Sequence, residues 1–126
     1  MTDRPRRVLI VEDDASIRDT LELALAVQGY QVATAANGRD GMALLREWRP
    51  DLIVLDLMMP VMDGRQFRVE QRLAGCDGVP VLVLTASRNA AESEDTLGAA
   101  ERLQKPFDLG YLLDTVNRLA QAEVQR

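Results

Sequence analysis

The sequence predicts an α/β fold, a doubly wound five-stranded parallel sheet with helices on both faces. Three runs, Arg7–Val11, Leu52–Leu55 and Val79–Leu84, carry β-branched and aliphatic side chains at successive rather than alternate positions. Strands buried on both faces have this composition, and a parallel sheet buries both faces when helices cover them. Segments with the period of an amphipathic helix separate these runs, and such alternation is typical of a doubly wound sheet.

The first two strand–helix units have well-marked boundaries. After the strand Arg7–Val11, one helix face is formed by residues that recur every three or four positions, namely Ile17, Leu21, Ala24, Leu25 and Gln28. Gly29 ends this helix, because glycine readily takes the left-handed conformation that follows a last helical turn. The strand Gln31–Ala35 comes next, and Asn37–Gly38 then opens a helix with Met42, Leu45 and Trp48 on one face before Pro50.

The last three units are less regular. The strand Leu52–Leu55 stops at Asp56, and Asp63–Gly64 opens a helix with Phe67 and Leu73 turned inward. The strand Val79–Leu84 stops at Thr85, Asn89–Leu97 has a weak helical pattern, and Arg102–Gln104 is a weak strand. The final helix starts after Asp108, a good N-cap residue, and has the clearest apolar stripe, formed by Leu109, Leu112, Val116, Leu119 and Ala120.

Length and composition indicate one globular domain covering residues 1–126. A hydrophobic fraction of 47% and a charged fraction of 28% are ordinary for a soluble protein. No apolar run approaches the roughly 20 residues that span a bilayer, and the first residues do not form a secretory signal. We therefore expect a cytoplasmic protein without membrane contact. The formal net charge of -5 argues against direct binding of nucleic acid.

Three features of the composition restrict the chemistry. Histidine is absent, so the chain has no Ser-His or Cys-His nucleophile pair and no histidine of its own to carry phosphate. The one cysteine, Cys76, cannot form an internal disulfide. Among the 15 basic residues only Lys105 is a lysine, a compact point charge on a flexible stem. A single lysine is weak evidence for a functional role, and its position in the fold decides how much the observation counts.

Polar residues stand at the carboxyl ends of four predicted strands, namely Glu12, Asp13, Asp56, Thr85 and Lys105. We choose the strand order 2-1-3-4-5, a choice that rests partly on family resemblance. Open parallel sheets bind ligands at the carboxyl ends of their strands near the switch point, which lies between strands one and three in that order. Three carboxylates gathered there would repel one another, and a hard cation such as Mg2+ relieves the repulsion.

A carboxylate can also accept a phosphoryl group and form an aspartyl phosphate. Asp56 ends the central strand and is the best acceptor, with Lys105 and Thr85 able to neutralise and hydrogen-bond the phosphoryl oxygens. Taken singly, Asp56 fits a turn, Thr85 a strand-end cap and Lys105 a surface charge. Their occurrence together on one sheet edge favours the phosphoryl site, whereas Asp14 is assigned to capping the next helix.

Four segments resemble the response-regulator receiver domain of two-component signalling, namely Val8–Asp14, Asp56–Gly64, Leu84–Ala86 and Lys105–Phe107. The resemblance extends from about Arg7 to Ala120 and implies a flavodoxin-like fold with a core over residues 7–120. It implies that Asp56 is phosphorylated, with a sensor histidine kinase or a phosphotransfer protein as the donor. Such a domain is a phosphoacceptor switch that assists only its own phosphorylation and dephosphorylation, and not an enzyme.

The resemblance also implies roles for the residues around Asp56. Asp13 matches the direct Mg2+ ligand, Glu12 the acid that reaches Mg2+ through water, and Met58 the residue whose backbone carbonyl completes the metal site. Thr85 and Lys105 match the pair that contacts the phosphoryl group. The bond before Pro106 is expected to be cis, which an X-Pro bond makes affordable.

Two features depart from the usual receiver pattern. Arg102 stands three positions before Lys105, where receivers usually have an aromatic or similar switch residue, and the interval from Thr85 to Lys105 is about two residues short. This region normally belongs to the output face, so we expect phosphorylation to survive and the signalling surface to be atypical. Met58 and Ser87 flank the site at positions that tune the access of water, and the apolar Met58 predicts a persistent phosphorylated state.

We expect a stand-alone regulator that acts on an output protein through the fourth helix, fifth strand and fifth helix, a face on which receivers also dimerise. The alternatives are a receiver from a larger transcription factor or hybrid kinase, and a phosphate-independent interaction module. A phosphatase is disfavoured because Met58 stands where a second general acid is needed. A flavodoxin-like cofactor binder is disfavoured because no glycine- or hydroxyl-rich phosphate loop follows the first strand.

Overall fold

Five parallel strands form one sheet at the centre of the molecule. The computed structural model describes residues 5–59, 61–86 and 98–124, with the backbone alone at 121–124. The strands are β1 (Arg7–Val11), β2 (Gln31–Ala35), β3 (Leu52–Asp56), β4 (Val81–Thr85) and β5 (Glu101–Gln104). Their order is β2-β1-β3-β4-β5, which confirms the predicted order. β4 begins two residues later than predicted, after Pro80, which has no N–H for a sheet hydrogen bond.

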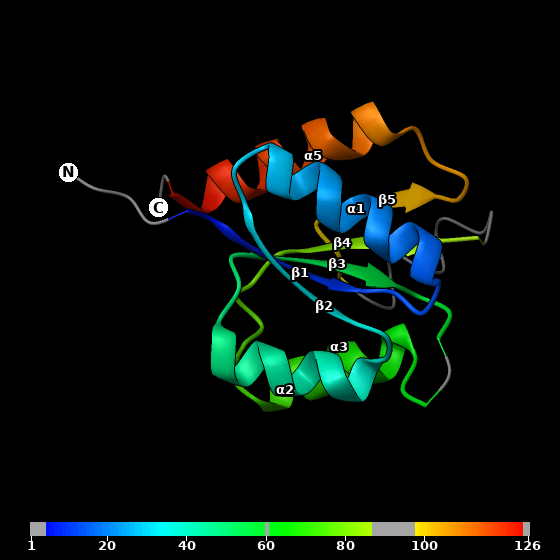
Figure 1. The fold of residues 1–126 in the computed structure, drawn as a ribbon. Helices are drawn as coiled ribbons and strands as arrows, with labels where there is room; N and C mark the ends of the chain where they lie inside the picture. Colours follow the sequence, from blue (N-terminus) through cyan, green and yellow to red (C-terminus); the bar gives the residue numbers. More distant parts are fainter. Residues whose placement is uncertain (1–4, 60, 87–97, 125–126) are drawn as a thin grey trace.

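Helices cover both faces of the sheet. They are α1 (Ala15–Val27), α2 (Gly38–Trp48), α3 (Gly64–Leu73) and α5 (Leu109–Val124). Figure 1 shows α1 and α5 on one face and α2 and α3 on the other. The predicted helix Asn89–Leu97 lies outside the described residues. Within the described part of the chain, no helix combines the length and the apolar character needed to cross a membrane.

Alternate strand residues face two separate cores. Leu9, Ile53 and Val83 belong to the core beneath α2 and α3, together with Phe67 of α3. Ile10 and Val54 belong to the core beneath α1 and α5, which includes members of both helices. All five residues of β3 and of β4 are buried. The continuous apolar runs of the sequence are therefore explained by burial on both faces.

Side-chain caps start each described helix in the loop that follows a strand. Asp14 accepts a hydrogen bond from Ile17 N at 3.1 Å, which confirms its predicted role as the N-cap of α1. Asn37 caps α2, and Asp63 caps α3 in a reciprocal capping box with Gln66. Asp108 accepts from Tyr111 N at 2.8 Å at the start of α5. These caps fix the loops at the carboxyl edge of the sheet, where the candidate site lies.

The inward face of α3 differs from the prediction. Leu73 is 75% exposed, so its predicted inward orientation is wrong. Gln71, one turn after the buried Phe67, takes the inward position instead. Its Nε2 donates to the carbonyls of Cys76 at 2.8 Å and Val79 at 3.1 Å, so burial of the amide is compensated by hydrogen bonds. Gln28 at the end of α1 is likewise exposed rather than on the inward face.

The amino ends of the strands are tied to α2. The Arg7 guanidinium lies 5.3 Å from the centroid of the Trp48 ring and donates to the Trp48 carbonyl. Arg7 N donates to Asp51 Oδ2 at 2.8 Å, and Asp51 N donates to Arg7 O at 2.8 Å. This cluster therefore holds the edge of the sheet opposite the carboxyl ends of the strands.

Candidate functional site

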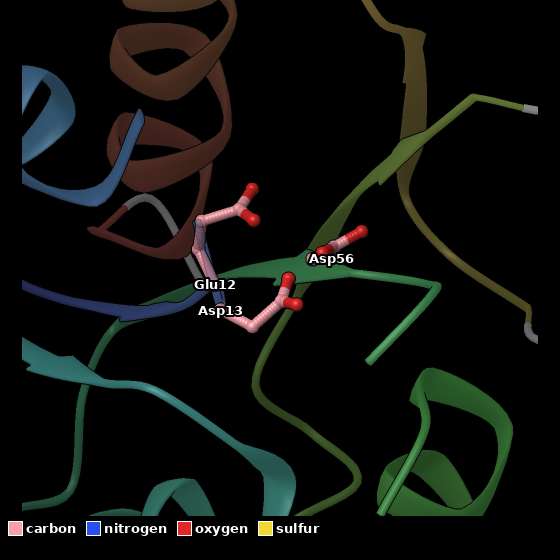
Figure 2. A group of neighbouring side chains, drawn as sticks. All are labelled: Glu12, Asp13 and Asp56. Carbon is pink, nitrogen blue, oxygen red and sulfur yellow. The ribbon is translucent and has the colours of Figure 1, made fainter. Parts of the chain in front are cut away.

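Three carboxylates meet at the carboxyl ends of two adjacent strands, β1 and the central strand β3. Glu12 and Asp13 directly follow β1, and Asp56 is the last residue of β3, the neighbouring strand. Figure 2 shows the two acids at the end of β1 beside Asp56. One oxygen from each of the three carboxylates lies within 4.8 Å of the other two. Glu12 is fully buried and Asp56 is 3% exposed, whereas Asp13 is open to solvent.

Lys105 brings the opposite charge to this cluster. It directly follows β5, and its Nζ lies 2.9 Å from Glu12 Oε1 and 3.5 Å from Asp56 Oδ2. Lys105 N donates to Thr85 O at 2.7 Å, which ties the end of β5 to the end of β4. The Lys105–Pro106 bond is cis, the geometry that the resemblance implies. The single lysine of the chain therefore lies among the predicted acids.

Burial and crowding shift the proton affinities of these groups. Burial raises the pKa of Asp56 to about 7, Asp13 and Glu12 add to the rise, and Lys105 opposes it. Burial by itself would lower the pKa of Lys105, but its hydrogen bond to Glu12 and the charges of Asp56 and Glu12 raise it. The cluster therefore carries more negative charge than it can stabilise alone, a condition that a bound cation relieves.

Backbone donors fix two of the three carboxylates. Met58 N donates to Asp56 Oδ1 at 3.1 Å, and Asp14 N donates to Glu12 Oε2 at 3.1 Å. Glu12 N donates to Ala35 O at 3.0 Å, which extends the contact between β1 and β2 by one residue. Asp13 is the third carboxylate of the cluster, and it is open to solvent.

The loop after Asp56 is closed by a tight contact with the start of α3. Gly64 N donates to Leu57 O at 3.0 Å, and a Cβ at position 64 would lie 2.9 Å from Leu57 Cα. Only glycine therefore allows α3 to start so near the end of β3. Val61 in the same loop has φ +71, a left-handed conformation that is strained for a β-branched residue.

The remaining predicted site residues are Thr85, Met58, Arg102 and Ser87, and the three that the structure describes differ in burial. Thr85 is fully buried at the end of β4, one residue beyond Leu84, which pairs with Asp56. The Met58 side chain is 68% exposed. Arg102 pairs with Val83 in the sheet, and its Nε is buried without a hydrogen-bond partner in the described part of the chain. Ser87 lies outside the described residues.

Sequence reasoning missed Arg18. Its Nη1 donates to Glu12 O at 2.9 Å and to Asp13 O at 3.5 Å. One signal was available, because a cation near the amino end of a helix is unfavourable towards the helix dipole and calls for a compensating contact. The charge sits in the first turns of α1, whose first turn has no acidic residue to balance it.

The donor set fits Mg2+. Glu12, Asp13 and Asp56 supply only hard oxygen ligands, and the one cysteine is not among them. Mg2+ prefers oxygen and is commonly held by one or two carboxylates while it keeps several waters. The raised pKa of Asp56 and the exposure of Asp13 agree with a site that accepts a hydrated cation from solvent. The residues present therefore fit a magnesium site.

Comparison with known proteins places this geometry in a large group. The family model described as the response regulator receiver domain matches residues 8–117. The transcriptional regulatory protein AfsQ1 of Streptomyces coelicolor is 48% identical over 109 residues, which are 85% of this chain and 47% of AfsQ1. The response regulator MprA of Mycolicibacterium vanbaalenii is 41% identical over 117 residues, which are 91% of this chain and 50% of MprA.

Solved structures agree with the sequence comparison. The chemotaxis protein CheY4 of Vibrio cholerae superimposes with a TM-score of 0.83 at 35% identity, over 92% of this chain and 99% of CheY4. A receiver domain of a Francisella response regulator superimposes with a TM-score of 0.86 at 28% identity, over 93% of this chain and 98% of that domain. The chain thus matches these structures over nearly their full length, but spans about half the length of the curated relatives it matches.

Proposed function

The chain belongs to the response regulator receiver family, and on that premise we propose that Asp56 accepts a phosphoryl group from a sensor histidine kinase or phosphotransfer protein in a Mg2+-dependent reaction. One observation carries the proposal. Asp56, at 3% exposure, ends the central strand within a cluster formed by Glu12, Asp13 and Lys105. We further propose that residues 1–126 form one receiver domain with its core over residues 7–120.

The transfer exchanges one bond to phosphorus for another. A carboxylate oxygen of Asp56 forms a P–O bond while the P–N bond of a phosphohistidine breaks, and the bonding electron pair stays with the imidazole nitrogen. Asp56 reacts as the carboxylate, so the proton that its raised pKa favours in the metal-free protein has to leave first. Met58 N donates a hydrogen bond to Asp56 Oδ1, and Oδ2 is the oxygen that faces Lys105 Nζ.

Glu12, Asp13, Asp56 and the backbone carbonyl of Met58 would hold the metal ion. When bound, Mg2+ supplies positive charge that offsets the carboxylates and the equatorial phosphoryl oxygens. Lys105 supplies a second positive charge from its place beside Glu12 and Asp56. Thr85, at the end of the adjacent strand, would offer its hydroxyl to a phosphoryl oxygen. The chain acts as the acceptor in this step and assists only its own phosphorylation and dephosphorylation.

Two neighbouring positions modulate the lifetime of the phosphorylated state in this proposal. The apolar side chain of Met58 is exposed beside Asp56 and would hinder the attack of water. Ser87, the second position to which the family resemblance gives this role, would influence the same step. We therefore expect a persistent aspartyl phosphate, and rapid loss of the phosphoryl group from purified protein would contradict this part of the proposal.

The output step would use the face formed by the fourth helix, β5 and α5, which would also serve for dimerisation. A stand-alone regulator would present this face to a separate output protein. The curated relatives favour a second form, because AfsQ1 is a transcriptional regulatory protein by name and about twice as long as the aligned segment. In that form the receiver would act on a nucleic-acid-binding region of the same polypeptide. Mass analysis of the natural protein distinguishes the two forms.

Intact-mass spectrometry after incubation with Mg2+ and acetyl phosphate tests the central step. One added phosphoryl group is expected in the wild type and none in Asp56→Asn. Asp114→Asn is the matched control, since Asp114 is an exposed carboxylate on α5 and should leave the adduct unchanged. A folded wild type that forms no adduct would instead support a phosphate-independent interaction module.

A further inference from the structure

We propose that Arg18 is a positioning residue for the Mg2+ site, an inference that rests on the proposed function. Arg18 lies in the first turns of α1 and donates from one guanidinium nitrogen to two successive backbone carbonyls, those of Glu12 and Asp13. The same two residues supply carboxylates to the metal-site cluster. Arg18 therefore ties α1 to the backbone that carries both acids.

The Asp13 carboxylate depends on the contact with Arg18 more than the Glu12 carboxylate does. The Glu12 side chain has contacts of its own, with Asp14 N at 3.1 Å and Lys105 Nζ at 2.9 Å. In the described part of the chain, the Asp13 carboxylate receives no hydrogen bond from a backbone N–H or a basic side chain, and it is exposed. Apart from the hydrogen bond with the Asp56 carboxyl, the position of its oxygens therefore depends on its backbone, to which Arg18 donates at 3.5 Å.

Positioning and charge predict opposite effects when Arg18 is removed. A guanidinium near the site repels Mg2+, so a role through charge alone would make metal binding tighter in its absence. A role in positioning would make binding weaker, because an exposed carboxylate on an unrestrained backbone has to be ordered when the metal binds. The direction of the change in Mg2+ affinity therefore identifies the role.

Isothermal titration of the metal-free protein with MgCl2 provides the test. Arg18→Met is expected to weaken Mg2+ binding by about 10- to 100-fold, the range found when residues that orient metal ligands are replaced. Arg18→Lys keeps a donor of similar reach and should recover most of that loss. Arg46→Met is the matched control, since Arg46 is exposed in the last turn of α2, and it should bind Mg2+ as the wild type does.

Circular dichroism and the metal-free melting temperature separate a structural role from a positioning role. Arg18→Gln, whose side chain is too short to reach both carbonyls, provides a milder substitution and should weaken binding by about 10-fold. Unchanged or tighter binding in Arg18→Met overturns the inference, whatever its melting temperature, and so does an equal loss in Arg18→Met and Arg18→Lys. A wild type that binds no Mg2+ would overturn the proposed function as well.

Discussion

At the scale of single residues, Asp56 combines two demands that oppose each other. Its burial beside Glu12 and Asp13 favours the neutral acid, whereas the proposed chemistry needs the carboxylate. The folded pKa of about 7 lies above the unfolded value of 3.8, so the folded protein binds more protons between these values. The metal-free protein should therefore lose stability as the pH rises from about 4 to about 7.

Asp56→Asn should remove this dependence. The variant is expected to be more stable than the metal-free wild type at pH 8 by about 2 kcal/mol, because each pKa unit corresponds to about 1.4 kcal/mol and solvent screens part of the rise. Urea denaturation between pH 5 and pH 8 in a chelator measures the difference. Added Mg2+ should reduce the difference in stability between the variant and the wild type at pH 8. A metal-free wild type whose stability does not change between pH 5 and pH 8 would contradict the raised pKa of Asp56.

Arg102 is a second residue that costs stability in the unphosphorylated protein. Its Nε is buried in a strand with no acceptor among the described residues, and an unsatisfied buried donor costs about 1–3 kcal/mol. Arg102→Met should therefore raise the free energy of unfolding by about 1 kcal/mol. Arg118→Met is the control, because Arg118 forms an exposed ion pair with Glu101 at 3.4 Å and should change stability by less than about 1 kcal/mol. Urea denaturation compares the two, and a loss in Arg102→Met would show that the guanidinium stabilises β5.

At the scale of elements, a polar side chain of α3 holds the loop that leads into β4. Gln71 is fully buried, accepts from Arg68 and donates to the carbonyls of Cys76 and Val79. Arg68 also donates to Gly98 O at 3.4 Å, on the chain that leads into β5. The loop between α3 and β4 therefore depends on hydrogen bonds from Gln71, whereas the sequence predicted that Leu73 would be the inward residue of this turn.

Gln71→Leu should destabilise the fold although it adds an apolar side chain to a buried position. The part-buried carbonyl of Val79 would lose the Gln71 donor, whereas the carbonyl of Cys76 would keep its bond from Val79 N at 3.2 Å. Arg68 would also lose an acceptor, and the expected loss in the free energy of unfolding is about 1–3 kcal/mol. Gln104→Leu on β5 is a control at an exposed glutamine and should change stability by less than about 0.5 kcal/mol. Chemical denaturation measures both, and equal stability of Gln71→Leu and the wild type would mean that water or repacking replaces the amide.

At the scale of the whole molecule, the sheet has a hydrophobic core on each side. Leu9 faces the core beneath α2 and α3, and Ile10 faces the core beneath α1 and α5. Leu9→Ala and Ile10→Ala should therefore each cost about 3–4 kcal/mol of stability, because each leaves a cavity in a closed core. Calorimetric unfolding tests this, and a small effect in either variant would indicate an open sheet face on that side.

The sequence predicts the sheet well because a short run of successive apolar residues is typical of a strand covered on both sides. Leu52–Leu55 and the runs like it require such burial, and strand order then brings Glu12, Asp56 and Lys105 to one edge. The inward residue of α3 was harder to predict. Apolar periodicity favours Leu73, because it does not show that nearby backbone carbonyls need the amide donor of Gln71. Arg18 was harder still, because its partners are backbone oxygens, which no residue pattern reveals.

The contact between Arg7 and Trp48 has a practical consequence for optical measurements. Trp48 is the only tryptophan, and it lies at the amino edge of the sheet, roughly 15 Å of strand away from the acidic cluster. Its fluorescence should respond to loss of the Arg7 guanidinium, which lies 5.3 Å from the ring centroid, and global unfolding separates the two groups. Emission should therefore report global unfolding while remaining insensitive to cation or phosphoryl occupancy. Tryptophan emission measured on the same sample thus provides an independent check that a variant which fails to bind Mg2+ or to accept a phosphoryl group is still folded.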